Sequence, residues 1–120
     1  MTRSLVVKAT AGSDEPERCA QAFTVAATAA ASGIPTSLWL TGESVWLAVP
    51  GRAAQFRLDH APPLEDLLDQ LLADARVTVC TACAARRGLS ADAFLPGVAV
   101  AGTASFVAEV TSGSTQALVY

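Results

Sequence analysis

The stretch Arg76-Val-Thr-Val-Cys80-Thr-Ala-Cys83-Ala-Ala-Arg86-Arg87-Gly88-Leu89 contains the change of secondary structure on which the fold depends. Its first four residues are mostly apolar and β-branched and predict a short buried strand. The residues after Cys80 are mostly alanine and arginine, and they predict a helix that ends at Gly88. Cys80 therefore lies where a strand changes into a helix.

This position favours chemistry at the sulfur of Cys80. In an open α/β sheet the carboxyl ends of parallel strands face the ligand crevice, and the next helix directs free N–H groups and its positive dipole end there. A thiol in that place ionises more easily, and the thiolate is the reactive form. We predict that Cys80 is a nucleophile whose anion is stabilised by the N–H groups of Thr81 to Cys83. The alternative is a buried structural cysteine, since free cysteine is often fully buried.

Strands and helices alternate along the whole chain. Further strands are predicted over residues 5–7, 37–40, 98–100 and 116–120, and helices over 14–32, 62–72 and 103–111. The alternation predicts one domain over residues 1–120, with an α/β fold: a three-layer α/β/α sandwich around a mostly parallel, five-stranded, flavodoxin-like sheet. Cys19 shares an apolar helical stripe with Phe23 and is assigned to the core, and Phe106, Val107 and Val110 are expected to face inward.

A flavodoxin-like strand order, 2-1-3-4-5, would make the first and third strands neighbours. Their carboxyl ends would then place Thr10, Ala11 and Gly12 beside Cys80, with Thr41 and Gly42 at the next strand end. Trp46 is expected to form a wall of this pocket or an oligomer contact. The predicted pocket residues are Thr10, Gly12, Thr41, Gly42, Trp46 and Thr81.

Cys83 follows Cys80 with the spacing Cys-x-x-Cys. Such a pair at the start of a helix is able to form a reversible disulfide, although thioredoxin-like proteins that do so have a different fold context. Cys83 either reacts with the group at Cys80 or packs against the sheet. A zinc site would need about two more ligands, and His60 and Cys19 do not have ligand-like spacing. We therefore expect no metal and no cofactor.

Composition restricts the classes of partner. The chain has 120 residues, of which 52% are hydrophobic and only 16% charged, so part of its surface is expected to contact other subunits. A net charge of -3 and a pI near 4.9 argue against nucleic acid. No stretch approaches the roughly 18–20 apolar residues of a membrane span, and Lys8 interrupts what would be a signal-peptide core. Three cysteines, an odd number, suit a reducing compartment, and the expected location is the cytoplasm.

Residues 79–89 resemble the active-site segment of the DsrE/DsrF/TusD sulfur-relay family, in which a strand ends in a cysteine followed by a small-residue turn and Arg-Arg-Gly. Residues 5–17 and 37–46 agree with the same family. The resemblance implies a DsrE-like domain that forms homotrimers or hexamers and meets sulfur donor and acceptor proteins. By motif position, Cys80 would accept a sulfane sulfur as a persulfide. Cys83 departs from the family pattern, which has a small residue without a thiol there.

Three functions are therefore considered. The first is a sulfurtransferase or persulfide carrier that uses Cys80. The second is a thiol–disulfide or peroxide-responsive protein that uses Cys80 and Cys83 as a pair. The third is a non-catalytic scaffold or small-molecule-binding module in which the thiols are incidental.

Overall fold

The computed structural model describes residues 3–120; the predicted domain also includes residues 1 and 2, which lie outside this part. The five strands are β1 (Ser4–Ala9), β2 (Thr36–Leu40), β3 (Arg76–Cys80), β4 (Ala99–Ala101) and β5 (Thr115–Val119). The helices are α1 (Pro16–Ala31), α2 (Arg52–Gln55), α3 (Leu64–Asp74), α4 (Thr81–Arg86) and α5 (Thr103–Val110), with 3-10 turns η1 (Gly42–Ala48) and η2 (Ala91–Ala93). The predicted alternation of strands and helices is confirmed.

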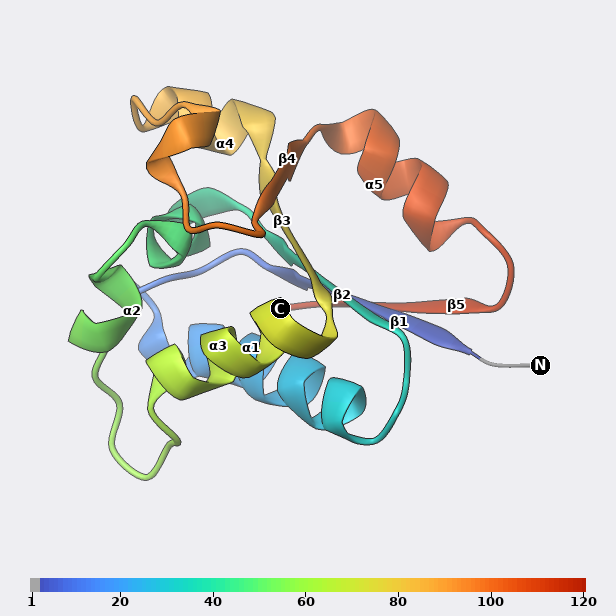
Figure 1. Ribbon diagram of the computed structural model, residues 1–120, viewed down its shortest axis with the longest axis horizontal. Coiled ribbons are helices and arrows are strands. Elements are labelled where there is room, and N and C mark those ends of the chain that lie inside the picture. The colour runs from blue at the N-terminus through green and yellow to red at the C-terminus, as the bar shows by residue number, and fades with distance from the viewer. Residues whose placement is uncertain (1–2) are drawn as a thin grey trace.

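The four strand pairings among the described residues are all parallel, in the order β4-β3-β2-β1-β5. The layered α/β architecture with a parallel sheet is confirmed, whereas the expected order 2-1-3-4-5 is wrong. The chain steps from β1 to β2, β3 and β4 in one direction, and only then returns to place β5 beside β1. Because such crossovers are right-handed, the return crossover lies on the opposite face from the earlier ones. Figure 1 shows α1 and α3 together on one side of the sheet and α5 on the other.

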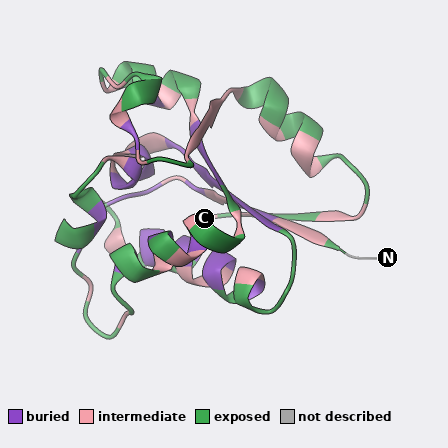
Figure 2. Cartoon of the chain, in the orientation of Figure 1, coloured by how far each residue is buried: buried purple, intermediate pink, exposed green. Residues whose placement is uncertain are grey.

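The face under α1 and α3, called here the sealed face, contains the main core. Alternate residues of the three inner strands face it. Most of them are buried, as are the apolar residues of both helices (Figure 2). Its largest members include Phe23, Leu38, Leu40, Leu64, Leu68, Leu71, Val77 and Val79. Cys19 lies in this cluster, as predicted. Small alanines on α1 let that helix approach the sheet closely.

On the opposite face, called here the open face, the covering helix within residues 3–120 is α5 (Figure 1). The strand register places Lys8, Trp39 and Thr78 in one row across it, two residues before Cys80 on the last of these strands. Trp39 and Thr78 are buried, whereas Lys8 and Cys80 are half-buried. The hydroxyl oxygens of Ser37 and Thr78 are buried on this face without a hydrogen-bond partner among the described residues. The open face is thus the more polar and less completely packed one.

Helix α5 turns only part of its apolar surface toward the sheet. Phe106 packs on Trp39, with ring centroids 5.3 Å apart and planes at 84°. Val107, which was expected to face inward, is 50% exposed, so that expectation is wrong. The helix has eight residues and lies on a half-covered sheet, so only one side of it is packed. Within residues 3–120, no helix is long and apolar enough to cross a membrane.

Candidate functional site

Cys80 lies where two neighbouring strands end and their connections diverge. It is the last residue of β3 and the N-cap of α4, and it pairs with Ala101, the last residue of β4. The chain leaves β3 through α4 and leaves β4 through α5, which returns across the other face. In open parallel sheets such a reversal marks the ligand crevice. The topological switch point therefore lies between β3 and β4, instead of between β1 and β3 as the flavodoxin-like order would have it.

The surroundings of Cys80 favour its ionised form. Partial burial of the sulfur acts to raise the pKa of Cys80, but the N–H and thiol of Cys83, the N–H of Ala82 and the charge of Arg86 together outweigh it, and the pKa is lowered. Hydrogen bonds to the thiolate stabilise it because they replace lost solvation. Among the amides of residues 81–83, those of Ala82 and Cys83 act to lower the pKa of Cys80.

The sulfur of Cys80 faces a small cavity on the open face. The cavity has a volume of about 40 Å³ and is lined by Lys8, Trp39, Thr41, Cys80, Thr103 and Phe106. Because Thr103 is the first residue of α5, the positive end of that helix dipole also lies at the cavity. No group of three or more His, Cys, Asp or Glu side chains that could hold a metal occurs among residues 3–120. The cavity combines aromatic walls, one ammonium group and one thiol.

The cavity walls are held by specific contacts. The Nζ of Lys8 lies 5.0 Å from the ring centroid of Phe106, a cation–π distance. The indole Nε1 of Trp39 donates a hydrogen bond of 3.2 Å to Oε2 of Glu109, so α5 is attached to the sheet at both Phe106 and Glu109. These contacts fix the position of the aromatic rings beside Cys80.

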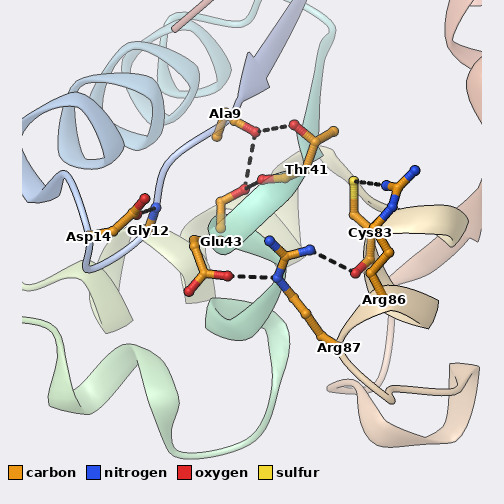
Figure 3. Close-up of polar contacts among 9 residues, drawn as sticks. Ala9, Gly12, Asp14, Thr41, Glu43, Cys83, Arg86 and Arg87 are labelled. Atoms are coloured by element: carbon orange, nitrogen blue, oxygen red, sulfur yellow. Dashed lines mark hydrogen bonds and ion pairs between the residues drawn. The ribbon is translucent and has the colours of Figure 1, made fainter.

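Cys83, Arg86 and Arg87 lie close together on and just after α4, the helix that follows Cys80 (Figure 3). Nη1 of Arg86 lies 4.0 Å from Sγ of Cys83. Arg87 donates from Nη1 to the carbonyl oxygen of Cys83 at 3.0 Å and from Nε to Oε2 of Glu43 at 2.7 Å. Glu43 belongs to η1, which follows β2, so this ion pair connects α4 to the carboxyl end of the neighbouring strand.

Of the predicted pocket residues, Thr41 lines the cavity of Cys80. Its hydroxyl donates to the carbonyl oxygen of Ala9 at 2.8 Å, which joins the ends of β1 and β2. Thr10 lies one strand farther away and donates to the carbonyl oxygen of Tyr120, which follows β5. Because β2 separates β1 from β3, Thr10, Ala11 and Gly12 do not adjoin Cys80 as expected.

The two predicted glycines shape the loops behind the site. A Cβ at Gly12 would lie 2.5 Å from the carbonyl oxygen of Glu43, and one at Gly42 would lie 2.6 Å from that of Thr10. Gly42 also has φ +56°, a conformation that favours glycine. Gly12 and Gly42 therefore allow the loops after β1 and β2 to pack backbone against backbone.

Trp46 and Thr81 lie outside the cavity. Trp46 is half-buried on η1, and the guanidinium carbon of Arg52 lies 4.5 Å from its ring centroid. Thr81 is exposed as the first residue of α4. The sequence-based prediction did not include the cavity residues Lys8, Trp39, Thr103 and Phe106. A sequence signal was available for two of them: Lys8 and Trp39 alternate with apolar residues along their strands, which places both on the open face.

Comparison with known proteins agrees with this architecture. The family model described as the DsrE/DsrF-like family matches residues 4–116. The ychN protein from E. coli is similar over 99% of this chain and 100% of its own, with a TM-score of 0.82 and 18% identity. MTH1491 from Methanobacterium thermoautotrophicum, described as a protein of unknown function, covers 100% of both chains with a TM-score of 0.71 and 10% identity. No curated protein matches. The extent of the family match shows that this chain belongs to the DsrE/DsrF-like family.

Proposed function

We propose that this protein carries sulfane sulfur as a persulfide on Cys80 and transfers it to a thiol of a partner protein. The observation that carries the proposal is the half-buried Cys80 sulfur at the mouth of a cavity, with a pKa lowered by amide and thiol hydrogen bonds. Membership of the DsrE/DsrF-like family supports the same conclusion.

In the loading step, the Cys80 thiolate attacks the outer sulfur of a donor persulfide. A new S–S bond forms, the donor's own S–S bond breaks, and the donor leaves as a thiolate. In the transfer step, an acceptor thiolate attacks the outer sulfur and Cys80 leaves as a thiolate. A lowered pKa gives Cys80 a larger thiolate fraction in the first step and makes it a better leaving group in the second.

The cavity is suited to the outer sulfur atom of such a persulfide. The cavity volume is about 40 Å³, whereas one water molecule needs roughly 10–15 Å³. The cavity therefore has room for one additional sulfur atom. The rings of Trp39 and Phe106 offer favourable contacts for a polarizable sulfur, and Lys8 supplies positive charge for the persulfide anion. A partner's folded chain is too large to enter, so transfer requires a partner thiol on an extended side chain or segment that reaches the mouth.

The proposal includes homo-oligomers, as trimers or hexamers, and separate sulfur donor and acceptor proteins in the reducing cytoplasm. Low charge content supports subunit contact, as does exposed apolar surface beside the open face, where Val107 on α5 is 50% exposed and Val119 on β5 is 64% exposed. Light scattering coupled to gel filtration tests this part: Val119→Asp is expected to lower the mass of the assembly, and a monomeric wild-type protein would contradict it.

The carrier function is tested by intact-mass analysis after anaerobic incubation with a persulfide donor. The wild-type chain is expected to take up sulfane sulfur, seen as a gain of about 32 Da or as products of that adduct. Cys80→Ser is expected to gain none. Cys19→Ser is the matched control, since Cys19 is a buried thiol on the sealed face and its loss is expected to leave loading unchanged. A gain that survives in Cys80→Ser would contradict the proposal.

The second candidate function is thiol–disulfide exchange with another protein by the Cys80 and Cys83 pair. The specific observation that favours it is the placement of Cys80 as the N-cap of α4 and of Cys83 as its third residue, where the Cys83 thiol acts to lower the pKa of Cys80. It predicts a reversible loss of about 2 Da under mild oxidant, as one disulfide forms. An unchanged count of free thiols after that treatment would rule it out.

A further inference from the structure

Cys80 and Cys83 occupy the two positions at the start of α4 that form a capping box in other helices. Cys80 is the N-cap of α4 and Cys83 is its third residue, the two positions whose side chains reach each other's backbone in such boxes. The N–H and the thiol of Cys83 both act to lower the pKa of Cys80. The second thiol therefore lies near the first, three residues later in the chain.

The two thiols have different neighbours. The cavity that would receive the outer sulfur is lined from β1, β2 and α5, and Cys83 is not part of it. Cys83 lies on α4, three residues after Cys80, and Nη1 of Arg86 is 4.0 Å from its Sγ. With the outer sulfur placed in the cavity, the sulfur nearer to α4 is the inner one, Sγ of Cys80. Cys83 would therefore attack the inner sulfur.

We propose that Cys83 resolves the persulfide on Cys80 and releases its outer sulfur as hydrosulfide. This inference rests on the proposed function. The Cys83 thiolate attacks Sγ of Cys80, the bond between inner and outer sulfur breaks, and HS⁻ leaves with the electron pair of that bond. The products are a Cys80–Cys83 disulfide and, with the proton lost from Cys83, H₂S. The sulfane sulfur is the oxidant and the two cysteine sulfurs are oxidised, so no other oxidant is needed.

The local structure permits this closure. Side chains three residues apart at the start of a helix have Cβ atoms about 5–6 Å apart, whereas a disulfide needs about 3.5–4.5 Å. A shift of about 1–2 Å is therefore required. Helix α4 has six residues and its first two are exposed, so few packing contacts oppose the shift. The guanidinium of Arg86 lies 4.0 Å from Sγ of Cys83. Its positive charge stabilises the negative charge on that sulfur as it attacks.

Resolution would limit the lifetime of the persulfide. An acceptor thiol must attack the outer sulfur before Cys83 attacks the inner one, so sulfur reaches the acceptor only when that partner is already bound. Without a partner, the chain would release sulfide and stop in the disulfide form.

The test uses inorganic polysulfide as the probe, under anaerobic conditions in which sulfane sulfur is the available oxidant. The reduced protein is mixed with polysulfide, passed through a desalting column, and sampled over time by alkylation and intact mass. The wild-type chain is expected to become about 2 Da lighter than the reduced protein and to release sulfide. Cys83→Ser and Cys83→Ala are expected to retain a gain of about 32 Da for at least about tenfold longer.

The outcomes separate the two proposals. A wild-type persulfide that persists as long as that of both Cys83 variants would overturn the resolving role and leave the carrier function intact. Failure of wild-type protein and both variants to acquire sulfur in any form would overturn the carrier function and the resolving role together. Thermal unfolding of each variant identifies any loss of folded protein, and Cys19→Ser, which keeps both thiols of the pair, is expected to behave as wild type.

Discussion

A cysteine on the sealed face of the sheet and a cysteine at the open face differ in exposure and in the direction of their pKa shift. On the sealed face, Cys19 is 1% exposed, and burial, with the nearby charge of Asp14, raises its pKa to about 12. At the edge of the open face, Cys80 is half-buried and its pKa is lowered by hydrogen bonds from the start of α4. The comparison shows that helix cover, and not residue type, determines which thiol of this chain is available for chemistry.

Alkylation of the native protein should give the largest difference between the faces. Cys80 is expected to react with iodoacetamide directly, and to keep reacting at lower pH than in the denatured chain because its pKa is lowered. Cys19 can react only after unfolding, so its alkylation is expected to be at least about 10³-fold slower than that of Cys80. Peptide mass spectrometry of each cysteine over time measures both rates. Equal rates would show that the two faces are not differently covered.

A pair of phenylalanines tests the packing of the two faces. Phe23→Ala removes a fully buried ring from the sealed face and is expected to cost about 3–5 kcal/mol of unfolding free energy. Phe106→Ala removes a half-buried ring from α5 and is expected to cost about 1–2 kcal/mol. Urea unfolding measures both costs, and equal costs would mean that α5 covers its face as completely as α1 and α3 cover theirs. Phe106→Ala should also speed the alkylation of Cys80.

The pH dependence of stability tests the environment of Cys19. The folded thiol keeps its proton up to about pH 12. An unfolded thiol loses it near pH 8.5, so unfolding releases a proton above that pH. The free energy of unfolding is therefore expected to fall as pH rises from about 8.5, by up to about 1.4 kcal/mol per pH unit. Cys19→Ala removes this contribution, and urea unfolding of both proteins between pH 7 and about pH 10 measures it. Parallel curves for the two proteins would contradict the assignment.

The smallest effect is expected at the ion pair between Arg87 and Glu43. Its side chains are 21% and 44% exposed, so solvent screens it, and Glu43→Gln is expected to cost about 0.5 kcal/mol at low salt and less at high salt. The alkylation rate of Cys80 should stay unchanged, because its sulfur is held by contacts within α4. A changed rate would show that the end of β2 helps position the thiol.

The layers of the fold and the place of Cys80 could be predicted because the signals are local. Short β-branched runs followed by helical stretches identify the strands, and the change from strand to helix at Cys80 lies within a few residues. Strand order could not be predicted in this way, because it depends on which neighbour each strand pairs with. One signal was present: the β2 sequence has large apolar residues at consecutive positions, Leu38, Trp39 and Leu40, so apolar side chains point to both faces of the sheet, as suits a central strand. The structure shows β2 buried along its whole length.

The cavity was predicted less well than the thiol. Lys8, Trp39 and Phe106 come from three elements that are distant in the sequence, and only the parallel register and the return crossover bring them beside Cys80. Trp46 carried the more conspicuous local signal, yet it lies on η1 and its ring contacts Arg52. A residue's contribution to the cavity is thus decided by the packing of whole elements.

The register of β3 has a consequence for how its sequence can vary in length. Successive residues of a strand point to opposite sides, so Thr78 and Cys80 share one side while Val77 and Val79 share the other. Deleting a single residue within this strand would reverse that parity and direct the sulfur into hydrocarbon, whereas deleting two would preserve it. Cys80 therefore stays on the open face only when the number of residues inserted or deleted between Arg76 and Cys80 is even. An odd number would turn the thiol into the core and abolish its reactivity.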